Sequence, residues 1–333
     1  MVLTDLLVRV FGSFNLRWQI IILAAATCIA APPLLHKSRL LYISWKKKKE
    51  PPVPVSVTYF PSSHCCDGTC CSHVEKTFCM LTVEEAKQGL RKLADAGMMK
   101  INLAGEDVFR FPDFLGLICQ YCREVLGLES VSIVTTNGME FTEEWLNKYG
   151  FFVDFIAVSC DSFDEKTNNE IGRGSGSNIQ QLCRIKAWCQ EYRVGFKMNT
   201  FVCSLNWKED MSVLIGELNP VRWKCFKARF VNGENHEQDG EGRGKMFDKF
   251  HITDEQFEAF CERHRHLGDR FTPKSNSVKA KSYLLLDEFM RFTDTGNGVG
   301  KTSESILNVS VAEALSQVGW DEESFKKRGG IFD

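Results

Sequence analysis

The strongest constraint on the fold is a regular alternation of strand-like and helix-like segments that begins near residue 55. Six short runs rich in β-branched and aromatic residues are typical of strands, and helix-like segments separate them. The expected strands are residues 55–60, 100–104, 131–136, 155–160, 194–202 and 222–231. Repeated βα units predict a parallel sheet with right-handed crossovers, either as a partial barrel or as an open doubly wound sheet.

The intervening helices carry their own start and stop signals. The clearest begins at Thr82, where Glu85 completes a capping box ahead of apolar residues at helical spacing, and it ends at Gly97. Further helices are expected at residues 114–126, 143–149, 179–192 and 211–218.

The loops that follow the first four expected strands are all unusual in composition. They are a cysteine-rich loop after the first strand and residues 104–107, 136–138 and 159–162 after the next three. Chemistry in parallel α/β folds collects where the strands reach their carboxyl ends. The sequence therefore predicts one functional site at that edge of the sheet.

The loop after the first strand is dense in soft metal ligands. Residues 60–79 hold five cysteines and two histidines. Thiolates and imidazoles bind zinc and iron, so this density predicts a metal or iron–sulfur site. An iron–sulfur cluster, a zinc ion and a loop without metal all remain open at this stage. The candidate ligands are Cys65, Cys66, Cys70, Cys71 and His73.

Most of the other cysteines and the overall charge argue against two classes of protein. Nine of the 14 cysteines lie singly among apolar residues, which indicates reduced, buried thiols in a cytosol-facing protein rather than a disulfide scaffold. The formal net charge of −2 gives no general attraction for polyanions, so specific nucleic-acid binding is not expected.

The first fifty residues differ in composition from the rest of the chain. Residues 3–16 fit an amphipathic helix lying on a surface, and the apolar run 20–31 is shorter than the roughly 20 residues that cross a bilayer. Trp45 and the four lysines at 46–49 favour an anionic cytoplasmic leaflet. We expect residues 1–50 to be a membrane-surface anchor with a basic linker and residues 51–333 to form the folded domain. A cleaved signal peptide and a solvated lysine run are the alternatives.

Many ordered stretches between residues 55 and 330 are similar to one known family. They include LTVEEAKQGL at 81–90, IAVSCDSFDE at 156–165, NPVRWK at 219–224, LDEFMRF at 286–292 and FKKRGG at 325–330. On these residues the chain resembles the viperin family, the interferon-inducible antiviral members of the radical S-adenosylmethionine enzymes.

The resemblance implies a fold, a location and a reaction. The fold would be a partial (βα)6 barrel with an N-terminal amphipathic helix on the cytosolic face of the endoplasmic reticulum and on lipid droplets. A [4Fe-4S] cluster on Cys-x3-Cys-x2-Cys would bind S-adenosylmethionine, and the reaction would convert CTP to 3′-deoxy-3′,4′-didehydro-CTP. Antiviral signalling proteins or viral proteins are further expected partners.

The resemblance also implies roles for particular residues. Tyr283 is expected to relay hydrogen or to pack on the nucleotide, which makes it the catalytic candidate. The residues expected to recognise S-adenosylmethionine are Gly105, Asp107, Asn137, Ser159 and Arg173. The residues expected to bind the triphosphate are Lys76, Lys100, Lys197, Asn199 and Lys224.

Two motifs depart from the family pattern. Cys65 and Cys71 occupy the outer ligand positions with one residue missing between them, whereas Cys66, Cys70 and His73 keep the spacing but end on a histidine. Residues 105–108 read Gly-Glu-Asp-Val where the family has Gly-Gly-Glu-Pro. The alternative hypothesis is therefore a catalytically silent, membrane-tethered paralogue that binds nucleotides or protein partners in innate immunity.

Overall fold

The computed structural model describes most of the chain after residue 52. It covers residues 53–62, 80–105, 108–135, 138–173, 176–228, 249–274, 282–294, 301–327 and 330. All of them belong to the unit Val53–Asp333. The predicted anchor and the cysteine-rich loop lie outside the described residues.

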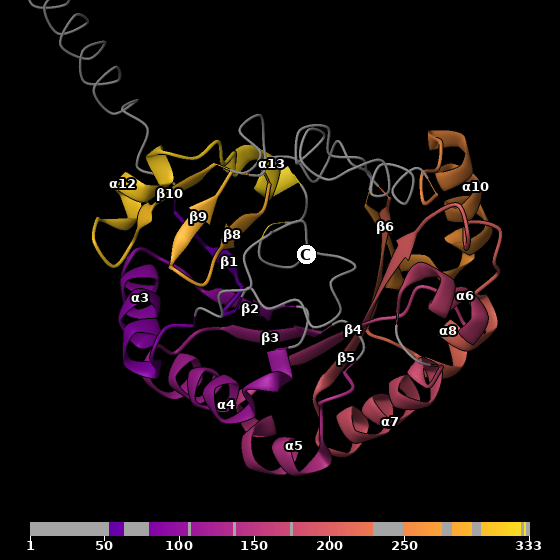
Figure 1. The fold of residues 1–333 in the computed structure, drawn as a ribbon, viewed down its shortest axis with the longest axis horizontal. Coiled ribbons are helices and arrows are strands. Elements are labelled where there is room, and N and C mark those ends of the chain that lie inside the picture. Colours follow the sequence, from indigo (N-terminus) through magenta and orange to yellow (C-terminus); the bar gives the residue numbers. More distant parts are fainter. Residues whose placement is uncertain are drawn as a thin grey trace, which may run out of the picture. The chain divides into compact units, whose positions relative to one another are not determined.

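One curved sheet organises this unit (Figure 1). Across the described residues it has ten strands in the order β10-β9-β8-β1-β2-β3-β4-β5-β6-β7. Strands β1 to β7 are parallel and β8 pairs parallel with β1, whereas β9 and β10 run antiparallel at the edge. The strands are β1 (Ser56–Tyr59), β2 (Lys100–Ala104), β3 (Ser130–Thr135), β4 (Phe155–Ser159), β5 (Gly195–Val202), β6 (Arg222–Lys227), β7 (Phe271–Lys274), β8 (Leu284–Leu286), β9 (Arg291–Thr293) and β10 (Thr302–Ser305).

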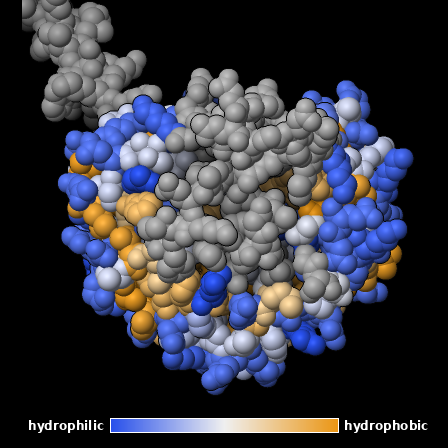
Figure 2. Space-filling model, viewed as in Figure 1, coloured by the Kyte–Doolittle hydropathy of each residue, from blue (hydrophilic) through white to orange (hydrophobic). Residues whose placement is uncertain are grey.

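Helices cover the convex side of the sheet (Figure 1). Hydrophilic residues dominate the rim that these helices form (Figure 2). No helix within the described ranges is long and apolar enough to span a membrane. The helices are α3 (Val83–Asp95), α4 (Pro112–Gln120) with a π-helical turn (Tyr121–Val125), α5 (Glu143–Tyr149), α6 (Glu165–Ile171), α7 (Asn178–Glu191), α8 (Ser212–Leu218), α10 (Asp254–His264), α12 (Val311–Ser316) and α13 (Glu322–Lys327), with 3-10 turns at Val108–Arg110, Gly150–Phe152 and Arg265–Arg270.

The structure confirms the predicted partial barrel. All six expected strands are present as β1 to β6, and the capping box of α3 is formed, with the Thr82 hydroxyl accepting from the Glu85 amide at 3.2 Å and the Glu85 carboxylate accepting from the Thr82 amide at 2.9 Å. The sheet is wider than predicted. Strand β7 extends it beyond β6, and β8 to β10 extend it beyond β1.

Alternation along the strands separates an apolar outer face from a polar inner face. In β5, Phe196 and Met198 are buried beneath the helices, and Lys197 and Asn199 face the other way. The packed core therefore lies between sheet and helices, and the inner face is free to carry polar side chains.

Candidate functional site

A cavity of about 330 Å³ lies on the inner face of the curved sheet. Its wall is built from β1 to β6 and from the segment that leads into β8. The lining residues are Ser56, Thr58, Phe60, Lys100, Asn102, Ala104, Gly105, Ser132, Val134, Thr135, Ala157, Ser159, Lys197, Asn199, Arg222, Lys224, Phe226, Tyr283, Leu284, Leu285 and Gly330.

The cavity brings together seven of the residues predicted from the sequence. Four of the five residues that were expected to bind a triphosphate line one cavity with the catalytic candidate and two expected cofactor residues. These seven are Lys100, Lys197, Asn199, Lys224, Tyr283, Gly105 and Ser159. Their individual roles remain predictions. Arg173 is described but is not among the lining residues. The remaining eight predicted residues lie outside the described residues: Lys76, Asp107, Asn137, Cys65, Cys66, Cys70, Cys71 and His73.

Positive charge is concentrated on one side of the cavity. Lys197 on β5 is in register with Arg222 on β6, and Asn199 is in register with Lys224. Lys100 adds a buried cation from β2. Within the described wall of the cavity there is no acidic residue. The site is therefore suited to an anion with several negative charges, because Lys and Arg are the usual partners of phosphate oxygens.

Arg222 was not among the residues predicted from the sequence. The signal was present, because residues two apart on a strand share a face and Arg222 stands two positions before Lys224. Arg222 lines the cavity wall beside Lys197 and two residues before Lys224, so it joins the candidate anion-binding residues.

Two buried hydroxyls on β3 lack partners, and the one on the cavity face is that of Ser132, because Thr135 lies three residues further along the strand and its side chain faces the helices. Ser132 and Thr135 on β3 are 3% and 2% exposed, and neither hydroxyl has a hydrogen-bond partner in the described structure. A buried polar group without a partner costs about 1–3 kcal/mol, so such groups indicate a ligand that completes them. No pattern in the sequence distinguishes them from other strand serines and threonines.

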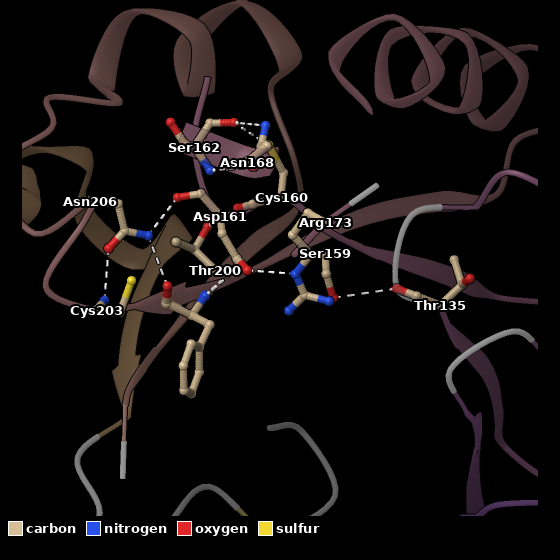
Figure 3. A network of polar contacts seen from close by, with 11 residues as sticks. Thr135, Ser159, Cys160, Asp161, Ser162, Asn168, Arg173, Thr200, Cys203 and Asn206 are labelled. Carbon is tan, nitrogen blue, oxygen red and sulfur yellow. Dashed lines mark hydrogen bonds and ion pairs between the residues drawn. The ribbon is translucent and has the colours of Figure 1, made fainter. Parts of the chain in front are cut away.

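A hydrogen-bond network fixes the loop after β4 at the carboxyl end of the sheet (Figure 3). The buried Asp161 carboxylate accepts from Arg173 Nε at 2.5 Å and from the Phe201 amide at 2.7 Å. Asn206 Nδ2 donates to the carbonyls of Asp161 and Phe201, at 2.6 and 2.8 Å. Arg173 is thus held beside the cavity wall by an ion pair, and Ser159 donates to the Thr135 carbonyl at 3.4 Å.

The described cysteines do not form a metal site. Seven of them are buried and one, Cys183, is exposed, and none lines the cavity. Burial raises the pKa of Cys122, Cys189 and Cys261 to about 12, so these thiols stay protonated. No group of three acidic, histidine or cysteine ligands occurs among the described residues.

The candidate cluster ligands predicted from the sequence belong to the loop after β1. That loop starts beyond residue 62, close in sequence to Phe60, which lines the cavity at the carboxyl end of β1. The donor set of the loop, thiolates and an imidazole, is chemically suited to iron or zinc. Two of the residues predicted to recognise S-adenosylmethionine line the cavity, Gly105 directly after β2 and Ser159 at the end of β4, and their role stays a prediction.

The amino-acid sequence is similar to those of several known proteins. It is 44% identical over 285 residues to "S-adenosylmethionine-dependent nucleotide dehydratase RSAD2" of Oncorhynchus mykiss, covering 84% of this chain and 80% of the relative. The protein of the same name from Danio rerio is 45% identical over 285 residues, with 84% and 78% covered. A bacterial S-adenosylmethionine-dependent nucleotide dehydratase from Lacinutrix mariniflava is 30% identical over 262 residues, with 76% and 51% covered. No model of a protein family matches the chain.

Solved structures support the fold. Streptococcus suis SuiB bound to S-adenosylmethionine aligns with a TM-score of 0.58 at 14% identity, covering 88% of this chain and 72% of that one. Native anSMEcpe with bound AdoMet and Cp18Cys peptide aligns with a TM-score of 0.60 at 12% identity, covering 82% of this chain and 84% of that one. With the fold of radical S-adenosylmethionine enzymes and these sequence relatives, the chain belongs to the viperin (RSAD2) family of S-adenosylmethionine-dependent nucleotide dehydratases.

Proposed function

We propose that this protein converts CTP to 3′-deoxy-3′,4′-didehydro-CTP in a reaction that depends on S-adenosylmethionine. The observation that carries the proposal is the group of cations Lys100, Lys197, Arg222 and Lys224 in a cavity whose described wall has no acid. A volume of about 330 Å³ falls within the range of about 300–1,000 Å³ that is usual for small-molecule sites.

Residues on different strands of the cavity wall bind the triphosphate and the nucleoside. Lys197, Arg222 and Lys224 on β5 and β6 bind the triphosphate, which fixes the nucleotide from its charged end. The unpaired hydroxyl of Ser132 on β3 forms a hydrogen bond with a polar group of the nucleoside. Tyr283 packs on the nucleotide from the segment before β8. Holding the substrate at several points restricts the ribose to one orientation, which is the main contribution of such a wall to the rate.

The cofactors supply the radical chemistry. When bound, a [4Fe-4S] cluster reduced by an external electron donor and S-adenosylmethionine would supply the radical that takes a hydrogen atom from the substrate. Gly105 and Ser159 would hold S-adenosylmethionine, and Arg173, fixed by Asp161, would contact its carboxylate. The cluster ligands would come from Cys65, Cys66, Cys70, Cys71 and His73. A zinc ion on the same loop is the alternative metal.

A second function is favoured by one observation. The cysteine spacing differs from Cys-x3-Cys-x2-Cys, whereas the cations of the cavity come from β2, β5 and β6 and not from the cysteine-rich loop. A protein that has lost the cluster would therefore keep its nucleotide site and act as a silent binder. We propose a membrane location for either function, on the cytosolic face of the endoplasmic reticulum and on lipid droplets, with antiviral signalling or viral proteins as partners.

Anaerobic reconstitution of the full chain with iron and sulfide separates the two functions. For the enzyme we expect the absorption of a [4Fe-4S] cluster and, after reduction with dithionite, its electron paramagnetic resonance signal. With S-adenosylmethionine added to the reduced protein, we expect 5′-deoxyadenosine release that requires CTP. A sample that binds CTP but forms no cluster and releases no deoxyadenosine would establish the silent binder. Stoichiometric zinc in the purified protein would contradict the cluster assignment.

A further inference from the structure

An aromatic ring lies against one of the cavity's cations. Phe155 begins β4 and faces the same side of the sheet as Ala157 and Ser159, which line the cavity. Lys197 Nζ lies 3.5 Å from the centre of the Phe155 ring. This separation is well inside the limit of about 6 Å for a cation–π contact. The ammonium group therefore rests on the face of the ring at the amino-terminal end of the cavity.

Gly195 makes this position of the ring possible. It is the residue of β5 that pairs with Phe155 across the sheet. A Cβ atom built at Gly195 would lie 2.4 Å from Phe155 Cδ1 and 2.7 Å from Cε1, and both distances are too short for real atoms. The ring thus packs directly on the backbone of residue 195, and any larger residue there would push it away from Lys197.

The contact with the ring leaves the charge of Lys197 in place. Lys197 is in register with Arg222, and Lys224 follows two residues later on β6, so three cations share one side of the cavity. The quadrupole of an aromatic ring attracts the ammonium group and leaves its formal charge intact.

We propose that Phe155, seated on Gly195, is a positioning residue that holds the Lys197 ammonium for the polyphosphate end of the substrate. The proposal deepens the proposed function, because it concerns how the same cavity grips its ligand. It predicts that Phe155 acts on the phosphate groups and has no part in recognition of the nucleoside.

The test compares three probes on the full chain by calorimetry: CTP, cytidine and inorganic tripolyphosphate. Phe155→Leu should weaken CTP and tripolyphosphate about threefold to tenfold, the range expected for loss of one partly desolvated cation–π contact, and should leave cytidine unchanged. Phe151→Leu is the matched control, since Phe151 is 90% exposed and outside the cavity. It should change none of the three affinities.

Two further variants separate positioning from packing. Replacing Phe155 by 3,4,5-trifluorophenylalanine keeps the shape of the ring but weakens its negative face, and it should lower tripolyphosphate affinity without lowering the unfolding midpoint. Gly195→Ala should weaken tripolyphosphate by displacing the ring. The double variant G195A/F155L should bind no worse than F155L alone, because both changes act through one contact.

The outcomes distinguish this proposal from the assignment of CTP. Unchanged tripolyphosphate affinity in the trifluorophenylalanine variant, or equal losses for cytidine and CTP in F155L, would overturn the role of Phe155 and leave the CTP assignment standing. Tripolyphosphate binding that depends on Phe155 in a protein that does not bind CTP would support the positioning role and refute the substrate. A wild-type protein that binds neither would refute both.

Discussion

The buried Asp161 gives the most exacting test of how the site is held together. Its carboxylate lies at zero exposure and accepts from Arg173 Nε and from the Phe201 amide (Figure 3). Asp161→Asn keeps an acceptor for Phe201 but turns the other position into an NH2 group that faces the Arg173 donor. The change removes one charge-assisted hydrogen bond, worth about 1.5–3 kcal/mol, and leaves a cation with part of its surface buried.

Because the Arg173 side chain is 27% exposed, water compensates part of the lost ion pair, and we expect a net cost of about 2–4 kcal/mol. For a domain of this size, that cost lowers the thermal unfolding midpoint by roughly 5–10 °C. Scanning calorimetry of the full chain measures the shift. The control is Asp164→Asn, an exposed helix N-cap where asparagine is an equally good residue, so its midpoint should barely move. Equal, small shifts in the two variants would refute the argument that Asp161 anchors Arg173.

Three other predictions follow from single features of the structure. Ser132→Ala removes an unpaired buried hydroxyl, so it should raise the unfolding midpoint of the free protein and weaken CTP binding. Ser130→Ala, on the same strand but outside the cavity, should leave CTP affinity unchanged. Equal CTP affinities in the two variants would contradict the role of Ser132. The pKa of His264 lies below its usual value of 6.5 because of burial, and its Nε2 accepts from the Met211 amide at 3.0 Å. The unfolded chain therefore takes up this proton first, and urea titrations should show stability falling as the pH drops from 6.5 towards the folded pKa, with a shallower decline in His264→Gln; identical slopes would remove His264 as the cause. Removal of residues 1–50 should leave a folded, soluble domain that no longer sediments with microsomal membranes, and continued sedimentation would refute the predicted anchor.

The parts of the fold that the sequence predicts are those with strong local signals. Strands β1 to β6 carry runs of β-branched and aromatic residues, and Thr82 with Glu85 marks the start of α3. Helices α6 and α10 were missed although their caps are visible in the sequence, since Asp164 caps α6 and Thr253 with Gln256 forms a capping box on α10. Strands β8 to β10 have only three or four residues each, which is too short for a periodic pattern.

The sequence predicted part of the cavity. Gly105 and Ser159 stand at the carboxyl ends of parallel strands, so the order of strands along the chain is enough to group them. Lys100 and Lys197 lie nearer the amino ends of their strands, and they share the cavity because they lie on the inner face of the sheet. The contact between Phe155 and Lys197 depends on the register of β4 with β5 and on the absent side chain of Gly195. The hydroxyls of Ser132 and Thr135 are unpaired because no hydrogen-bond partner lies near them among the described residues. Such properties belong to the packed structure and leave no pattern in a single sequence.

The central claim is that the cavity binds a nucleoside triphosphate through the cations of β5 and β6. The most direct measurement is a calorimetric titration of CTP into the full chain and into the double variant R222A/K224A. The double variant should lose more binding free energy for CTP than the roughly 0–1 kcal/mol of an exposed ion pair, so its affinity should fall more than about tenfold. The control is Lys148→Ala, which removes an exposed ion pair and should leave the CTP affinity unchanged. Equal CTP affinity in the wild type and in R222A/K224A would contradict the account.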